Sequence, residues 1–285
     1  MKAKIIILTP VYKDWKNLNK LLSKINRLFL YKIKQKFDLI IIDDYSLEKY
    51  EIKKSKFKQI KRLKVLRNPK NLGSQRSIAL GIKFIKNFYK KNFNLIVIDS
   101  DGQDNPNGIL KLMNKFKSKS TSVVAKRGQR KESLWFKTCY EIYCSLIFFL
   151  AFKQIRFGNF SLLRSKDMND VLKNENIWGA FPPTLSLSLK RLSFITIDRE
   201  RRYSGISKMN FWGLTYHALR VFSVLRNRIL IFSLIYIFIF FIIIPKSIFI
   251  VISIPIVLLN FSNFILALSN KKNFKEYYNR LIISD

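Results

Sequence analysis

Three carboxylates gather within six positions of the segment NLIVIDSDGQDNPN (94–107), as Asp99, Asp101 and Asp104. Side chains alternate along a strand, so Asp99 and Asp101 would point the same way, and Gln103 would follow if the chain stays extended. Two carboxylates and an amide oxygen are hard ligands that suit Mg²⁺ or Mn²⁺. Such a cation could hold a diphosphate and stabilise it as a leaving group. The alternative, a turn with helix-capping acids, competes mainly at Asp104.

These acids need elements that bring them to one place, and the first half of the chain has a repeating pattern. Short apolar runs rich in β-branched residues alternate with helical patterns. The predicted strands are 4–10, 37–44, 63–68, 94–101 and 122–127, with helices near 15–29, 75–91 and 107–117. Continuous apolar strands alternating with helices predict an α/β fold with a mostly parallel sheet covered on both faces.

Polar residues follow several of these predicted strands. Ligands bind beyond the carboxyl ends of the strands in such sheets. The residues expected to converge on one cleft are Pro10, Tyr12, Asp43, Asp44, Asn68, Asp99 and Asp101. The sequence contains no G-x-G-x-x-G and no G-x-x-x-x-G-K-[ST] motif, so it does not support a dinucleotide or P-loop site.

The charge of the chain is strongly one-sided. Lys and Arg number 53 against 18 Asp and Glu, a formal net charge of +35 over 285 residues. The excess favours anionic partners such as phosphates, nucleic acid or an anionic membrane leaflet. Lys, Ile, Asn and Phe are all abundant together, so a general compositional bias explains part of it. Cys139 and Cys144 form neither a zinc motif nor a secretory disulfide pattern, which favours a reducing compartment.

The C-terminal part changes character sharply. Residues 229–245 and 247–269 are uncharged, and each run approaches or reaches the roughly 20 residues that cross a bilayer as a helix. Basic residues flank this pair, whereas the turn between the runs holds only Lys246. The positive-inside rule then predicts a two-helix transmembrane hairpin in the inner membrane, with both ends cytoplasmic. The alternative is a hairpin buried in a soluble protein. The N-terminal segment meets Pro10 and Lys13 too early for a signal peptide and indicates a strand.

Two aromatic-rich helical segments, 133–152 and 210–227, lie between the sheet and the hairpin. The second has a narrow polar stripe that includes His217 and Arg220. Helices of this kind suit a membrane interface, with ordinary core helices as the alternative. We expect His217, the one histidine of the sequence, to face solvent or lipid headgroups rather than to act as a catalyst.

Five motifs occur in a recognisable order: PVYKDW, IIDDYS, NLGSQRSIALG, IDSDGQDNPN and RRYSGISK. Together they resemble family 2 glycosyltransferases with a GT-A fold, most closely the dolichol-phosphate mannose synthase and bacterial polyprenyl-phosphate glycosyltransferase branch. The resemblance covers roughly residues 3–210. It implies a GT-A catalytic domain over 1–208, an amphipathic juxtamembrane helix over 209–228, a transmembrane hairpin over 229–270 and a basic cytoplasmic tail over 271–285.

The resemblance also implies roles for single residues. The implied ligands of Mg²⁺ or Mn²⁺ are Asp99, Asp101 and Gln103. The implied contacts to the nucleotide sugar are Pro10, Tyr12, Asp14, Asp43, Asp44, Asn71, Gly73, Asp99, Arg127 and Ser207. The implied catalytic and phosphate-binding residues are Asp101, Arg202 and Lys208. Asp14 stands where the family usually has Glu, Tyr45 where it has Gly, and Asn159 where close relatives often carry Asp.

The nature of the acceptor can be argued from acid–base chemistry. A sugar hydroxyl is a poor nucleophile and normally needs a positioned base. A lipid monophosphate has a second pKa of about 6 and is mostly dianionic at neutral pH, so it can attack without a base. Residues 105–200 contain no acidic residue in an obvious catalytic motif, and the Q-x-x-R-W element of processive synthases is missing. The sequence therefore predicts inverting transfer of a hexose from a UDP- or GDP-sugar to polyprenyl phosphate at the cytoplasmic membrane face.

Other readings remain open at this point. A family 2 enzyme that acts on a glycolipid or polysaccharide hydroxyl is the main alternative. The segment IDSDG also resembles the opening of haloacid-dehalogenase-like phosphohydrolases, but their nucleophile usually lies on the first strand. A non-enzymatic, cationic, membrane-anchored binding protein explains the charge but not the ordered motifs. We expect contacts with anionic membrane lipid and none with nucleic acid, since no recognition motif is present. The motifs leave a homo-oligomer open.

Overall fold

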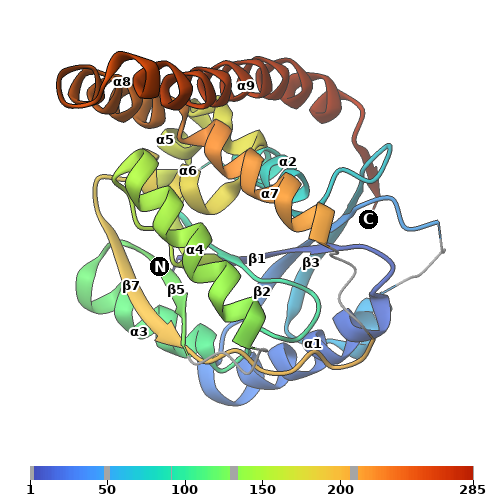
Figure 1. The fold of residues 1–285 in the computed structure, drawn as a ribbon. Coiled ribbons are helices and arrows are strands. Elements are labelled where there is room, and N and C mark those ends of the chain that lie inside the picture. The colour runs from blue at the N-terminus through green and yellow to red at the C-terminus, as the bar shows by residue number, and fades with distance from the viewer. Residues whose placement is uncertain (1–2, 48–51, 91, 129–133, 206–210, 285) are drawn as a thin grey trace.

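The computed structural model describes residues 3–47, 52–90, 92–128, 134–205 and 211–284. In this part of the chain the core is a sheet of eight strands in the order β7-β5-β6-β4-β1-β2-β3-β8. Figure 1 shows the sheet and the helices around it. The strands are β1 (Lys4–Val11), β2 (Phe37–Asp43), β3 (Ile60–Arg67), β4 (Phe93–Val97), β5 (Ser122–Arg127), β6 (Phe157–Arg164), β7 (Leu192–Ile197) and β8 (Ile282–Ser284). The centre, β4-β1-β2-β3, is parallel, which confirms the predicted α/β fold.

The remaining strands differ from a simple alternation. β6 runs antiparallel to both of its neighbours, β4 and β5, while β5 and β7 are parallel. The sequence patterns had indicated neither β6 nor β7. β4 also ends at Val97 rather than at 101, and the chain turns through Gly102 at φ 80°. The acidic pair therefore follows the strand instead of continuing it.

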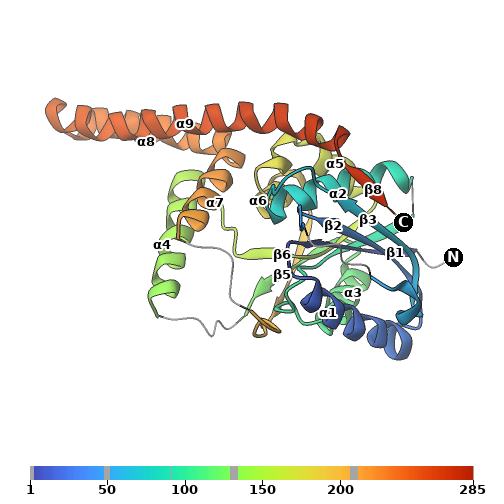
Figure 2. The same ribbon diagram turned by 90° about the vertical axis from the view of Figure 1, so that its right-hand side faces the viewer.

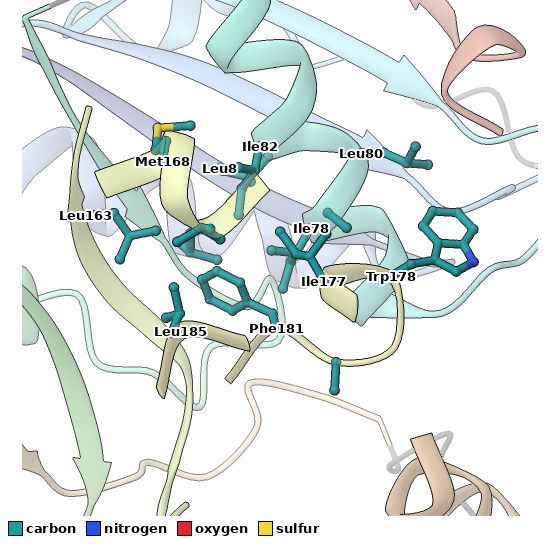
Figure 3. Close-up of a cluster of buried hydrophobic side chains, with 14 of the residues drawn as sticks. Leu8, Ile78, Leu80, Ile82, Leu163, Met168, Ile177, Trp178, Phe181 and Leu185 are labelled. Carbon is teal, nitrogen blue, oxygen red and sulfur yellow. The ribbon is translucent and has the colours of Figure 1, made fainter. Parts of the chain in front are cut away.

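Helices cover both faces of the sheet. α1 (Trp15–Leu28) and α3 (Gly108–Lys119) pack on one face, and α2 (Ser74–Phe88), α5 (Asp167–Lys173) and α6 (Phe181–Ser188) on the other (Figure 2). β1 shows why the strands are apolar throughout: Ile5 and Ile7 lie in the α1 cluster, whereas Ile6 and Leu8 lie in the α2 cluster. Alternate side chains of a strand enter opposite layers, so a doubly covered strand needs apolar residues at every position. Figure 3 shows the α2 cluster.

The long apolar helices lie on the α2 side of the molecule (Figures 1 and 2). They are α4 (Leu134–Ala151), α7 (Phe211–Val224), α8 (Arg226–Ile243) and α9 (Lys246–Asn279). α8 and α9 form a hairpin that reaches beyond the rest of the molecule (Figure 2). The 18 residues of α8 have a mean hydropathy of 2.0, an 18-residue stretch of α9 has 2.3, and only 11% and 6% of these stretches are buried. Both are long and apolar enough to cross a membrane, though two such helices alone are weak evidence.

The end of the chain is more ordered than the expected basic tail. α9 continues to Asn279, and its last turns pack Phe274 and Tyr277 on Trp178 with ring centroids 5.5 and 5.7 Å apart. Trp178 belongs to a short 3₁₀ helix (Glu175–Trp178) and is fully buried. β8 then pairs antiparallel with β3. Aromatic packing and strand pairing thus return the segment after residue 270 to the sheet.

Candidate functional site

The segments that follow β1, β2 and β4 meet at one edge of the sheet. The Asp44 amide donates to the Val11 carbonyl at 2.8 Å, and the Ile98 amide donates to the Leu8 carbonyl at 3.1 Å. These bonds continue the strand pairing just past the carboxyl ends of the strands, where parallel sheets bind ligands. The predicted convergence of the β1, β2 and β4 ends is therefore present.

A chain of hydrogen bonds fixes the Asp99 carboxylate. The Asn159 amide nitrogen donates to Asp99 Oδ1 at 2.9 Å, and Asn159 Oδ1 accepts from the Gln75 amide at 2.8 Å. Gln75 Oε1 in turn accepts from the Phe181 backbone amide at 2.8 Å. The Asn159 amide can donate to one neighbour and accept from the other, whereas an ionised Asp at this position could only accept. This explains the structural role of Asn159 in a position where relatives often carry Asp.

Asp101 sits in the turn beyond Asp99. Its Oδ1 accepts from the Gln103 backbone amide at 3.0 Å, while its Oδ2 lies 3.7 Å from Arg202 Nη1. Gly102 lies between Asp101 and Gln103 in the chain and has a φ of 80°. A Cβ on this residue would be 2.3 Å from the ring of Tyr203. The turn requires glycine for both reasons, because an L side chain would be strained and would also strike the ring.

The segment 199–205 runs alongside this turn. The Glu200 amide donates to the Gln103 carbonyl at 2.9 Å, and the Tyr203 amide donates to the Asp101 carbonyl at 3.2 Å. Arg202 also hydrogen-bonds Asp14. The two sequence motifs that contain Asp101 and Arg202 are therefore in contact, about a hundred positions apart in the chain. Ser207 and Lys208, which were predicted as partners of Arg202, lie outside the described residues.

The Asp14 end of this contact is also fixed. The Asn17 amide donates to Asp14 Oδ1 at 2.8 Å and to the Ser204 carbonyl at 2.9 Å, and the Ser204 hydroxyl donates to Asn17 Oδ1 at 2.6 Å. Asn17 is buried on α1 and joins the start of that helix to the 199–205 segment. The sequence had not singled it out. A buried Asn in an otherwise apolar helix face was the available signal.

Electrostatics at the acidic turn favour a cation. Burial, and next the neighbouring Asp101, raise the pKa of Asp99, while the Asn159 hydrogen bond and Arg199 and Arg127 oppose the shift. Burial and then Asp99 raise the pKa of Asp104 to about 7. The neighbouring carboxylates of Asp99 and Asp104 are therefore destabilised as anions, and a bound cation would stabilise them.

The donor set of this turn suits a hard divalent ion. The oxygens of Asp99, Asp101 and Gln103 fit Mg²⁺ or Mn²⁺ by type. Among the described residues no three His, Cys, Asp or Glu side chains form a metal cluster, so an amide oxygen or ligand oxygens would have to complete the coordination. Asp99, Asp101 and Gln103 stay the predicted ligands.

Asp43 and Asp44 are buried and organise the neighbouring loops. Asp43 accepts from the Ser46 amide and from Arg67 Nε, each at 2.8 Å. Asp44 accepts from the Gly73 amide at 2.7 Å, and from the Leu72 amide and the Asn68 side chain, each at 2.8 Å. These bonds fix the loops around the cleft. Contacts from either carboxylate to a base or ribose stay predictions.

The backbone conformation of Tyr45 shows how the loop accommodates a tyrosine where the related motif usually has glycine. Tyr45 takes a left-handed conformation, with φ 68°. The loop therefore keeps the turn that glycine would favour. A non-glycine residue in this region costs roughly 1–2 kcal/mol, and the bonds of Asp43 and Asp44 hold the loop in place.

The other predicted contact residues surround the same edge. Pro10 is buried in β1, Tyr12 follows that strand and Asn71 is exposed. Gly73 precedes α2 at φ 85°. Arg127 ends β5, and its guanidinium lines a pocket together with Asp99, Asp104, Asn159, Asp198 and Arg199.

His217 is less exposed than the polar stripe indicated. It is half-buried on α7, and burial followed by the charge of Arg220 lowers its pKa to about 4. The imidazole is therefore neutral at pH 7.

The sequence and the fold were compared with protein-family profiles, curated proteins and solved structures. Residues 6–171 match the profile of glycosyl transferase family 2. An uncharacterized glycosyltransferase from Synechocystis sp. is 24% identical over 228 residues, which cover 77% of this chain and 68% of that protein. Glucosyl-3-phosphoglycerate synthase from Mycobacterium tuberculosis, solved with uridine diphosphate, has a TM-score of 0.51 at 13% identity over 80% of each chain. For Staphylococcus aureus TarS the TM-score is 0.49 at 14% identity, over 79% of this chain and 39% of that one.

The profile matches more than half of the chain, and its span includes β1, β2 and β4 with the residues that follow them. The solved structures share the fold only, at these identities. The GT-A arrangement, the acidic turn after β4 and the family profile agree with one another. This protein belongs to glycosyl transferase family 2 and is a glycosyltransferase that takes its sugar from a nucleotide sugar.

Proposed function

We propose that this glycosyltransferase transfers a hexose from a UDP- or GDP-sugar to polyprenyl phosphate with inversion, as in the dolichol-phosphate mannose synthase branch. The observation that carries the lipid part is the position of α7. This helix leads directly into the exposed hairpin of α8 and α9. Its Arg220 Nη1 lies 3.8 Å from the position that a Cβ at Gly73, beside the cleft, would occupy. An apolar anchor and a sugar-donor cleft are thereby joined by one helix.

The residues of the acidic turn would hold the donor. Asp99, Asp101 and Gln103 are the proposed ligands of Mg²⁺ or Mn²⁺. When bound, the ion neutralises the diphosphate and stabilises it as a leaving group. Arg202 hydrogen-bonds Asp14 and the Ser204 carbonyl, and its Nη1 lies 3.7 Å from Asp101, so this positive charge would lie beside the diphosphate. Ser207 and Lys208 are proposed to extend this basic contact.

The transfer step needs little from the protein beyond positioning. One oxygen of the lipid phosphate forms a bond to the anomeric carbon as the bond from that carbon to the nucleoside diphosphate breaks. Attack from the opposite side inverts the anomeric centre. The acceptor is already a dianion at neutral pH, so no base has to remove a proton. Fixing the Asp99 carboxylate through Asn159 and Gln75 keeps the donor site rigid.

The proposed location is the cytoplasmic face of the inner membrane. α8 and α9 would cross it as a hairpin, with anionic lipid against the basic residues that flank it. α4 would lie beside the hairpin at the interface. The Tyr236 hydroxyl of α8 donates to the Phe149 carbonyl of α4, Phe152 just after α4 stacks on Phe232 of α8 at 5.2 Å, and α4 exposes Ile142 and Phe149. Interface helices with aromatic residues are typical of this depth.

A hydroxyl acceptor is the second candidate function. The observation that favours it is the pocket beside Asp99, which contains the carboxylates of Asp104 and Asp198. A carboxylate in such a place could act as the base that a sugar hydroxyl requires. The two candidates differ in their product, because mild acid cleaves a sugar–phosphate–lipid linkage and leaves an ordinary glycoside mostly intact.

A transfer assay decides between them. Membranes that contain the protein receive a panel of radiolabelled nucleotide sugars with Mg²⁺ or Mn²⁺, with and without polyprenyl phosphate. We expect acid-labile label in the lipid phase that depends on the added lipid, and a loss of several powers of ten in Asp101→Asn, since the donor diphosphate loses its cation. Acid-stable label would discard the phosphate acceptor. Near-normal transfer by Asp101→Asn would refute the proposed metal site.

A further inference from the structure

Two arginines, Arg76 on α2 and Arg220 on α7, lie together beside the cleft. Both contact Trp178: the Arg76 guanidinium lies 5.3 Å from the centre of its ring, and Arg220 Nη2 donates to its carbonyl at 3.1 Å. Within the described residues, neither guanidinium has a carboxylate at salt-bridge distance. Two like charges brought together repel each other, and an anion bound between them would remove that repulsion.

Arg220 is the more constrained of the two. Only 7% of it is exposed, and its Nε atom has no hydrogen-bond partner among the residues that the structure places. Arg76 Nε is likewise buried without a partner there. Burial, and after it the charge of Arg76, lower the pKa of Arg220 to about 10, which still leaves it charged at pH 7. A buried guanidinium with unused donors is stabilised strongly by a bidentate anion.

The start of α2 points into the same place. Arg220 Nη1 lies 3.8 Å from where a Cβ on Gly73 would be, and Gly73 is the residue before the helix. The N-cap residue, Gly73, has no side chain to cap α2, and Asp44 accepts from the amides of Leu72 and Gly73, which precede the first turn. Free backbone amides and the positive end of the helix dipole favour a phosphate at such a terminus. Gly73 also leaves room for the ligand, since it has no side chain.

Asp44 supplies part of the balancing charge. Its carboxylate raises the pKa of Arg220, but its oxygens already accept three hydrogen bonds from Asn68, Leu72 and Gly73. Two arginines against one carboxylate leave a net positive charge at the start of α2. An ordinary structural ion pair therefore does not account for the second arginine.

We infer that Arg76, Arg220 and the first turn of α2 bind a phosphomonoester dianion, and that this is the phosphate of the acceptor lipid. The assignment to the acceptor rests on the proposed function. The site lies one residue from Gln75, which is linked through Asn159 to Asp99, so an anion there is close to the donor site. Its other wall is α7, which continues into the α8–α9 hairpin. A phosphate on a membrane-embedded chain would arrive along this helix.

Binding and kinetics with the full-length protein in detergent test the inference. Calorimetry would measure the affinity for a short-chain prenyl monophosphate and for inorganic phosphate. The variants are Arg76→Gln, Arg220→Gln and Arg220→Lys, with Arg27→Gln as the control because Arg27 is exposed on α1. Loss of one charged hydrogen-bond partner should weaken monophosphate binding roughly 10- to 100-fold. Lysine should restore part of it as a point charge, and the control should bind as the native protein does.

The outcomes separate this site from the proposed function. Inorganic phosphate should compete for the site. Phosphatidylglycerol in mixed detergent micelles presents a phosphodiester and should bind without dependence on Arg220. Equal binding of monophosphate by all variants, or equal dependence of phosphatidylglycerol on Arg220, overturns the site. If the variants transfer sugar to polyprenyl phosphate with an unchanged acceptor KM, the site fails and the proposed function stands. If monophosphate binds through both arginines but no acid-labile product forms, the function fails and the phosphate site stands.

Discussion

Changing Asn159 to Asp tests the hydrogen-bond chain behind the acidic turn. The substitution removes the amide that donates to Asp99 Oδ1 at 2.9 Å and places a second carboxylate against it. Loss of a hydrogen bond to a charged group costs about 1.5–3 kcal/mol. Like charges at this separation repel by at most roughly 6 kcal/mol at an effective dielectric constant of about 20. Protonation of one carboxylate limits the total, so we expect a loss of about 2–5 kcal/mol in the free energy of unfolding at pH 8.

The pH dependence gives the sharper test. The paired carboxylates of Asn159→Asp should have folded pKa values above their unfolded ones. Such groups favour the folded state at low pH and lose that contribution as pH rises through the folded pKa. The deficit relative to the native protein should therefore grow from pH 5 to pH 8. The assay is thermal unfolding in EDTA followed by tryptophan fluorescence, with a Tm drop of roughly 4–15 °C at pH 8.

A matched control keeps this prediction falsifiable. Asn92→Asp adds the same charge at an exposed turn, where the residue already has φ 59°, and should leave the Tm nearly unchanged. Mn²⁺ should recover much of the loss in Asn159→Asp, because a cation between carboxylates removes their repulsion. If Asn159→Asp unfolds at the native temperature at pH 8 without metal, the proposed chain from Gln75 to Asp99 does not hold the carboxylate.

Three further predictions follow from the described contacts. Gly102→Ala should lower the Tm and the transfer rate, because its Cβ would strike Tyr203 and the residue has a positive φ. The cost is about 1–3 kcal/mol in the free energy of unfolding, which thermal unfolding would detect. An unchanged Tm would contradict this geometry. Trp178→Ala removes the contact with Tyr277 and should lower the free energy of unfolding by about 3–5 kcal/mol. Limited proteolysis should then cut near β8 first. Protection equal to that of the native chain would count against this packing. In EDTA the Tm of the native protein should fall as the pH rises from 5 to 8, because burial raises the folded pKa of Asp104 to about 7. Divalent metal should reduce this pH dependence. A Tm that rises over this range would refute the prediction.

The sequence predicted the parallel centre of the sheet because β1, β2 and β4 are buried on both faces and must be apolar throughout. It also predicted that Asp99 and Asp101 would lie at the carboxyl edge. It did not predict β6 or β7, whose antiparallel insertion depends on pairing between distant segments. Local patterns carry no information on such pairings.

The supporting residues of the site were missed for the same reason. Gln75 and Asn159 are 84 positions apart, and their bond exists only in the folded chain. Arg220 was placed on a polar stripe expected near lipid headgroups, yet it is buried against Trp178. Its burial depends on the packing of α7 against the Trp178 segment, which helix periodicity does not describe.

The pairing of β8 with β3 sets an order of events during synthesis. The end of β3 that β8 covers, residues 65–67, stays an open edge until residues 282–284 have left the ribosome. In the proposed topology, α8 and α9 must enter the membrane between these two moments. In that topology, β8 can pair with β3 only if the hairpin has returned the chain to the side on which it entered. A chain whose hairpin fails to insert would expose the β3 edge, a surface prone to pairing with other chains, and quality control could recognise it.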